Sequence, residues 1–136
     1  MMLSLELIFE LRNERNAIKM QENYLIGEIY WVDLPDRHGK EQRGRRPAII
    51  WQESDLYISL PTVMTIPLTS TLAASRLPGT VRIAHTSTNG LSQTSVALVF
   101  QLVSCDVKRI GQRLGNLEKR DLDAVERQLR QLLRLP

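Results

Sequence analysis

The stretch GEIYWVDL, residues 27–34, is rich in β-branched and aromatic residues that partly alternate with polar ones, which is typical of a β-strand. A loop with proline, glycine and many charges follows it at 35–45. Pro47 has no backbone N–H to donate, so it must lie at the beginning or the edge of the next strand. Further strands are predicted for RPAIIWQ, PTVMTIPL, GTVRIAHT and TSVALVFQLVS, with a short one near QRLGNL. The pattern predicts an antiparallel β domain.

The C-terminal stretch EKRDLDAVERQLRQLLRL, residues 118–135, has a different period. Its apolar residues recur at helical spacing, at Leu122, Val125, Leu129 and Leu132, and Leu133 widens the stripe. Acidic residues come early in this stretch and arginines late, which is the order that the helix macrodipole favours. One amphipathic helix is therefore predicted to close the fold.

Residues 1–22 precede the first strand as an extension with loose helical periodicity at Leu3, Leu7 and Leu11. Met20 lies just upstream of the strand, so translation from Met20 would leave the domain whole. Both a helical arm and an over-long gene prediction fit this pattern. We therefore divide the chain into an extension at 1–22 and one domain at 23–136.

The chain of 136 residues has the length and composition of one globular domain, with 43% hydrophobic and 24% charged residues. Its net charge of +3 is too small to require a polyanionic partner. The charge is concentrated, however, because residues 36–46 hold five basic side chains and two acidic ones. They are Arg37, Lys40, Arg43, Arg45 and Arg46, and Asp36 and Glu41.

Several familiar kinds of site are not indicated. His38 and His85 lack further ligands at metal-binding spacing, and the single Cys105 is expected to be a small buried side chain. The sequence contains no G-x-S-x-G elbow and no Gly-rich phosphate loop. No apolar run approaches the roughly 18 to 20 residues that span a bilayer. We expect a soluble, cytoplasmic protein.

Arginine and hydroxyl chemistry remains. Arg46 stands where the charged loop enters a strand, and its planar guanidinium could bind two oxygens of a phosphodiester. Hydroxyl groups of Thr69, Ser70 and Thr71 follow a later strand and could position an oxygen of a scissile group. Taken separately, a basic loop is usually a solvated surface, and Thr-Ser after a strand is usually a turn. The residues alone therefore leave nucleic-acid binding open and do not establish catalysis.

The blocks GEIYWVDL, EQRGRRPAII, IPLTS and VFQLVSCD occur in an order that resembles the MazF/PemK family of toxin endoribonucleases. The resemblance covers roughly residues 27–133, and EQRGRRPA is its most specific block. It implies a small SH3-like antiparallel β-barrel of the CcdB/PemK type with a C-terminal helix, assembled as a homodimer. It also implies sequence-selective cleavage of single-stranded RNA without a metal or other cofactor. The 2′-OH would attack the adjacent phosphate and leave a 2′,3′-cyclic phosphate and a 5′-OH.

The resemblance assigns roles position by position. It places the catalytic arginine at Arg46 and the catalytic hydroxyl at Thr69. A fixed guanidinium would stabilise the dianionic, phosphorane-like transition state, while the threonine would donate to a phosphoryl oxygen. Because arginine stays protonated, charge stabilisation suits Arg46 better than general base catalysis. The predicted substrate-binding residues are Glu41, Arg43, Arg45, Ser70, Arg76 and Gln101.

Three positions depart from the PemK branch of the family. Phe100, Leu98 and Lys40 stand where that branch has an aspartate, an arginine and a histidine. The carboxylate-based mechanism of that branch is therefore not expected, and the MazF-type pair is favoured. RNA would follow the basic loop, with Arg76 and the rest of the 71–78 loop near the bases. Little base stacking is expected unless Tyr30, Trp31 or Trp51 is exposed, and at least one tryptophan should be in the core.

Two functions remain open. One is a ribonuclease toxin held in check by a MazE-like antitoxin, whose acidic, extended segment would cover the basic groove. The other is a non-catalytic or decayed member of the same barrel fold that binds protein or RNA. The presence of Arg46 and Thr69 favours the first. A CcdB-like poison is the weakest alternative, because the chain stops at LLRLP without the aromatic end of those poisons.

Overall fold

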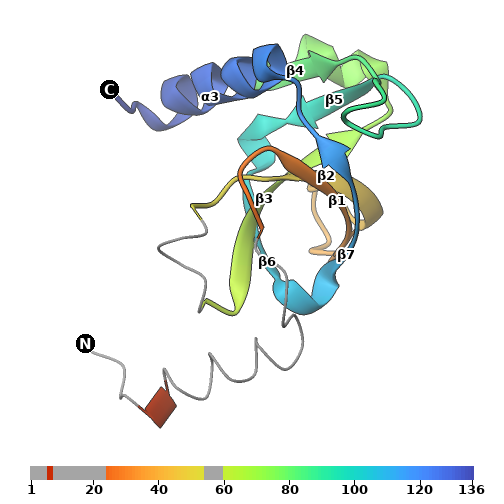
Figure 1. Ribbon diagram of the computed structural model, residues 1–136. Helices are drawn as coiled ribbons and strands as arrows, with labels where there is room; N and C mark the ends of the chain where they lie inside the picture. The colour runs from red at the N-terminus through yellow and green to blue at the C-terminus, as the bar shows by residue number, and fades with distance from the viewer. Residues whose placement is uncertain (1–5, 8–23, 54–59) are drawn as a thin grey trace.

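The computed structural model describes residues 6–7, 24–53 and 60–136, whose arrangement is shown in Figure 1. Apart from residues 6 and 7, the predicted extension at 1–22 lies outside the described residues. The strands are β1 Glu28–Leu34, β2 Gly44–Ile50, β3 Thr62–Thr69, β4 Thr80–Ile83, β5 Ser95–Leu98, β6 Val103–Asp106 and β7 Ile110–Asn116. The helices are the long α3 Lys119–Leu133 and three short 3-10 helices, η1 Leu72–Arg76, η2 Val99–Gln101 and η3 Val107–Arg109.

The strands form one antiparallel sheet in the order β4-β5-β3-β2-β1-β7, with β6 paired to the first half of β3. Strands β1, β2, β3, β6 and β7 curl around a common interior, and β4, β5 and α3 lie at one end of this barrel (Figure 1). The predicted fold class, a mainly antiparallel β domain with a C-terminal helix, is confirmed.

The predicted strand at 94–104 is wrong as a single element. The chain pairs with the end of β3 through β5, turns through η2, and pairs with the beginning of β3 through β6. The registers of the two halves differ by three residues, which η2 takes up. Backbone hydrogen bonds from Phe100 N to Gly79 O and from Leu102 N to Val99 O hold the turn. The sequence hides this break because apolar residues continue through it.

Two apolar clusters lie on the two faces of the curled sheet. The barrel interior contains Tyr30, Val32, Ala48 and Ile50 with residues of β3, β6 and β7. The second cluster contains Ile49, Ile66 and Leu68 of the sheet and packs against buried residues of α3. Successive side chains of a strand point to opposite faces, so β2 contributes to both clusters in alternation. This alternation continues into the arginines at its start.

Helix α3 confirms the predicted amphipathic helix in its middle part. Val125 and Leu129 are buried in the second cluster and Leu122 packs against it, whereas Leu132 and Leu133 are exposed. The helix ends at Leu133, and the C-cap residue Arg134 adopts a left-handed conformation with φ of 55°. No helix among the described residues is long and apolar enough to cross a membrane.

Candidate functional site

Strands β2 and β3 separate at the point where the predicted catalytic residues stand. They pair from Ile50 with Thr65 to Ala48 with Pro67, and β3 then leaves β2 to pair with β5. At Pro47, β2 is paired with β1 and no longer with β3. The N–H that proline lacks is therefore not needed for a hydrogen bond to β3. If the β2–β3 register is continued past the separation, Arg46 stands opposite Thr69. The separation opens the sheet between the two residues.

Alternation along the strands divides the predicted residues into two groups. Arg46 lies on the same barrel-interior face of β2 as Ala48 and Ile50. Its partner in the β1–β2 ladder is Val32. Thr69 follows Pro67 on the corresponding face of β3. Arg45 and Ser70 point to the opposite face, which carries Pro47 and Leu68. The predicted catalytic pair thus lies on one face, and two predicted substrate-binding residues lie on the other.

The side chains of the catalytic pair are held by the backbone around them. The Nε of Arg46 donates to the carbonyl oxygen of Arg43 at 3.0 Å, and the side chain is half-buried. Thr69 is only 5% exposed, and its Oγ1 accepts a hydrogen bond from Thr71 N at 3.2 Å. A hydroxyl that accepts this bond can still donate its own hydrogen. Both groups are therefore oriented before any ligand binds.

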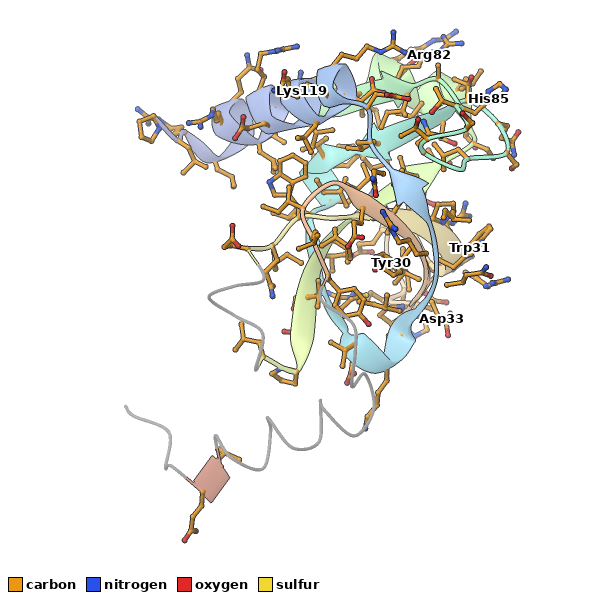
Figure 2. All side chains as sticks on the ribbon, in the orientation of Figure 1. Tyr30, Trp31, Asp33, Arg82, His85 and Lys119 are labelled. Carbon is orange, nitrogen blue, oxygen red and sulfur yellow. The ribbon has the colours of Figure 1, made fainter. Side chains whose placement is uncertain are left out.

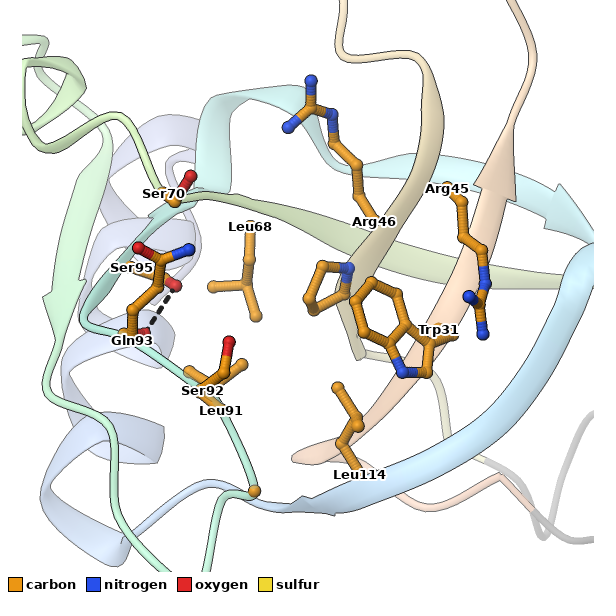
Figure 3. Close-up of a pocket in the computed structure, with 12 residues that line it drawn as sticks. Trp31, Arg45, Arg46, Leu68, Ser70, Leu91, Ser92, Gln93, Ser95 and Leu114 are labelled. Atoms are coloured by element: carbon orange, nitrogen blue, oxygen red, sulfur yellow. Dashed lines mark hydrogen bonds between the residues drawn. The ribbon is translucent and has the colours of Figure 1, made fainter.

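A cavity of about 280 Å³, which we call the Trp31 hollow, lies on the face of Arg45 and Ser70. Its floor is apolar and its rim carries short polar side chains (Figure 3). The guanidinium of Arg46 points away from this hollow in Figure 3, although the residue contributes to its rim. The lining residues are Trp31, Arg45, Arg46, Pro47, Leu68, Ser70, Gly90, Leu91, Ser92, Gln93, Ser95 and Leu114.

A second cavity of about 240 Å³, the Gln101 hollow, contains Pro67 and therefore lies on the other side of β3. Gln101 Oε1 accepts a hydrogen bond from Gln42 N at 2.8 Å, which ties the basic loop to η2. Gln42 Oε1 is buried and has no partner among the described residues. The lining residues are Leu34, Pro35, Arg37, Glu41, Gln42, Pro67, Phe100, Gln101, Leu102 and Val103. Glu41 and Gln101, two of the predicted substrate-binding residues, thus line the same cavity.

Two predicted substrate-binding arginines are not brought into either hollow. Arg43 is exposed, and its Nη1 forms an ion pair with Asp36 Oδ2 at 3.2 Å within the loop. Arg76 ends η1 and is exposed beyond the end of β3. Lys40 is also exposed on the loop. These side chains are placed to attract an anion rather than to hold one in a fixed geometry.

The tryptophans differ from the expectation that one would be in the core. Trp51 and Trp31 are both half-buried, and only Trp51 packs against the second cluster. Arg45 covers the ring of Trp31, with Cζ 4.6 Å from the ring centroid. Tyr30, in contrast, is buried in the barrel. Trp31 is therefore the one of these three aromatic residues that lines the candidate site.

Other candidate groups have structural explanations. Cys105 is buried in the barrel, as predicted, and burial raises the pKa of its thiol, so the reactive thiolate is disfavoured. His38 and His85 are exposed. In the part of the chain that the structure describes, no three His, Cys, Asp or Glu side chains come together as metal ligands.

Comparison with known proteins decides the family. Residues 26–133 match the family described as PemK-like, MazF-like toxin of type II toxin-antitoxin system. The chain belongs to this family. Endoribonuclease MazF6 of Mycobacterium tuberculosis is 33% identical to this MazF-like toxin over 109 residues, which are 79% of this chain and 95% of the relative. The resemblance inferred from the sequence motifs is therefore confirmed.

Solved structures show that the fold is shared. The crystal structure of MazF from Deinococcus radiodurans aligns with a TM-score of 0.71 and 23% identity, covering 83% of this MazF-like toxin and 98% of that chain. An endoribonuclease in complex with its cognate antitoxin, from a Mycobacterial species, aligns with a TM-score of 0.64 and 21% identity. That alignment covers 82% of this chain and 96% of the other.

The sequence prediction missed part of the candidate site of this MazF-like toxin. Ser92 and Gln93 on the loop before β5 line the Trp31 hollow, and Gln42 lines the Gln101 hollow. The stretch NGLSQTS, a glycine turn followed by amide and hydroxyl side chains, was the available signal for the first two. It was indistinct because the same composition describes any exposed loop.

Proposed function

We propose that this MazF-like toxin is an endoribonuclease that cleaves single-stranded RNA through Arg46 and Thr69. The enzyme class rests on the family and on the names of its curated relatives. The residue assignment is supported by one observation above all: the separation of β2 and β3 exposes a half-buried arginine opposite a buried threonine hydroxyl. An RNA phosphate at this gap would meet both groups.

The proposed chemistry is internal transesterification. The 2′ oxygen bonds to the adjacent phosphorus, the bond from phosphorus to the 5′ oxygen breaks, and the 2′ proton is lost to water while the 5′ oxygen gains one. Arg46 stabilises the extra negative charge of the phosphorane-like state, and the Thr69 hydroxyl donates to a phosphoryl oxygen. Dependence on a 2′-OH would spare DNA.

The RNA nucleotides next to the scissile phosphate would bind the two groups of residues that lie on opposite faces of the sheet. Glu41 and Gln101 would contact nucleotides in the Gln101 hollow, and Arg45 and Ser70 would contact them in the Trp31 hollow. Arg43 and Arg76, which lie outside both hollows, would contribute long-range attraction to phosphates. The proposal includes a homodimer, a MazE-like antitoxin that blocks the basic face, and action on mRNA in the cytoplasm.

The test incubates the protein with a long RNA in excess EDTA, beside Arg46→Ala and Arg127→Ala. Arg127 is an exposed arginine of α3 that lines neither hollow, so its loss changes the net charge equally. We expect cleavage by the parent and by Arg127→Ala, no cleavage by Arg46→Ala, and products with 2′,3′-cyclic phosphate and 5′-OH ends. Intact RNA with the parent would overturn the enzyme, and equal cleavage by all three would overturn Arg46.

A further inference from the structure

A third cavity of about 240 Å³ lies beside the Trp31 hollow, and we call it the Arg109 hollow. Trp31 and Arg45 line both cavities, so the two hollows lie on either side of this stacked pair. Figure 2 shows Trp31 and Asp33 together on the outer side of β1, whereas Lys119 of α3 lies at the other end of the molecule. The lining residues of the Arg109 hollow are Trp31, Val32, Asp33, Arg45, Lys108, Arg109, Ile110 and Gly111.

Arg45 and Trp31 together form a cationic and aromatic ridge between the two cavities. Arg45 Cζ lies 4.6 Å from the centroid of the Trp31 ring, which is the geometry of a cation–π contact. Arg45 stands opposite Asp33 in the β1–β2 ladder, so its backbone is fixed by the sheet. Guanidinium planes and aromatic rings are the surfaces on which proteins stack unpaired nucleobases.

The Arg109 hollow is positively charged, and hydrogen bonds hold part of its lining in place. It is lined by the three cations Arg45, Lys108 and Arg109 against the single carboxylate of Asp33. The Nη1 of Arg109 donates to the carbonyl oxygen of Asp33 at 3.3 Å, which holds the guanidinium beside β1. The turn η3 that carries Arg109 is capped by Asp106, whose Oδ1 accepts from Lys108 N at 2.8 Å. A fixed guanidinium in a cationic cavity suits a phosphate group.

The Trp31 hollow differs from the Arg109 hollow in the side chains that line it. It contains Arg45 and Arg46 but no carboxylate, and Ser70, Ser92 and Gln93 surround an apolar floor. Its volume is near the lower end of the roughly 300–1,000 Å³ of sites for drug-sized ligands, so it has room for one planar base. A base-sized hollow, a stacking ridge and a phosphate-binding hollow thus follow one another across β1 and β2.

We propose that the Trp31 and Arg109 hollows are successive subsites for one strand of RNA. A base enters the Trp31 hollow beside the Arg45–Trp31 ridge, and a neighbouring phosphate binds Arg109 and Lys108. This inference rests on the proposed function, because it extends the path of the cleaved strand. It directs the RNA across the outside of β1 toward η3, rather than along the basic loop toward Arg76. An acidic protein segment would use the charges but not the ridge and the base-sized hollow.

The test compares Arg109→Ala with Arg127→Ala, which removes the same charge from α3. The ligand is an oligonucleotide around a mapped cleavage site, with a 2′-O-methyl group at the scissile nucleotide so that it binds without being cut. Binding is measured across a salt series for the two variants and the parent. We expect Arg109→Ala to weaken binding severalfold and to reduce the salt slope by about 0.7, the value for one single-strand phosphate contact. Arg127→Ala should keep the parent slope.

Two further measurements separate the parts of the proposal. Arg45→Lys keeps the charge but loses the planar stack, so it should keep the salt slope while binding more weakly. Cleavage by Arg109→Ala should show a raised KM and an unchanged kcat, because Arg109 lies away from the proposed scissile phosphate. Lengthening the oligonucleotide on one side should tighten binding for the parent but not for Arg109→Ala.

The outcomes distinguish the proposed function from the proposed role of the Arg109 hollow. A parent that neither cleaves nor binds RNA overturns the proposed function and this inference together. A parent that cleaves RNA, beside an Arg109→Ala variant with the parent's affinity and salt slope, overturns the inference alone. In that case the cationic hollow would serve another polyanion, such as an acidic protein segment.

Discussion

The Gln101 hollow and the Trp31 hollow lie on opposite faces of β3, and they differ in the side chains that they present. The first combines a charged loop with the amide of Gln101, on the strand face that carries Arg46 and Thr69. The second has an apolar floor, serine and amide side chains, and the Arg45–Trp31 stack. Consecutive arginines of one strand therefore serve different surfaces. Changes to Arg46 and Thr69 on the first face should alter the rate of cleavage, and changes on the second face should alter binding.

The largest effect is expected from Arg46→Lys, which keeps the charge on the first face but removes the planar fork. The ammonium group cannot reproduce both the bond to the Arg43 carbonyl and a two-pronged contact with phosphate. We expect kcat to fall about 10²-fold or more, by analogy with the loss of a preorganised donor. Single-turnover cleavage of a mapped RNA site measures this, with Arg82→Lys on β4 as the control. Full activity of Arg46→Lys would mean that charge alone suffices.

Thr69→Val should have the next largest effect, because it keeps the shape of a buried side chain and deletes its hydroxyl. A hydrogen bond to a charged group contributes about 1.5–3 kcal/mol, so kcat should fall roughly 10- to 100-fold with little change in KM. Thr69→Ser, which retains the hydroxyl, should recover most of the rate. If valine and serine reduce kcat equally, the hydroxyl has no part in the reaction and the assignment of Thr69 is wrong.

Ser70→Ala tests the second face with a smaller change. The side chain is exposed and lines the Trp31 hollow, so its loss removes one neutral hydrogen bond to RNA, worth about 0.5–1.5 kcal/mol. We expect KM to rise severalfold while kcat is unchanged, as measured by steady-state cleavage. Ser75→Ala on η1 is the matched control, because this serine lines neither hollow. A fall in kcat for Ser70→Ala would erase the distinction between the two faces.

The sequence predicted the elements better than their connections. Strand patterns at 27–34 and 61–68, and the helical stripe through Val125 and Leu129, matched the structure because each follows from one buried face. The break at η2 was missed, because β5 before it is buried and apolar residues continue after it at Leu102 and Val103. Pairing register, which decides where β3 leaves β2, depends on contacts between distant segments that no local pattern contains.

The arrangement of the candidate site residues also depends on contacts between distant segments. Family motifs placed Arg46, Thr69 and Gln101 by position in the chain, but they could not show that the side chains of Arg45 and Arg46 lie on opposite faces of β2. That division follows from strand alternation together with the separation of β2 from β3. The proximity of Trp31 to Arg109 was also beyond the sequence, since it depends on the pairing of β1 with β7 and on the turn η3.

The smallest effect is expected away from both main hollows, at Asp121 in the first turn of α3. This side chain is 6% exposed, and its Oδ2 has no hydrogen-bond partner among the described residues. Burial raises the pKa of its carboxyl, which the nearby Arg120 guanidinium lowers to a lesser extent. A raised folded-state pKa gives stability that is present below the unfolded pKa and is lost as the pH rises through the folded value.

Asp121→Asn should therefore raise Tm by about 3 °C at neutral pH, and the gain should disappear as the pH falls below about 4. Cleavage should be unchanged, because Asp121 lies in neither the Gln101 nor the Trp31 hollow. Asp123→Asn is the matched control: it lies on the same turn but pairs with Lys119 at 2.8 Å, so its loss should lower Tm slightly. Equal losses of Tm in both variants would mean that the positive end of the helix stabilises the Asp121 carboxylate more than burial disfavours it.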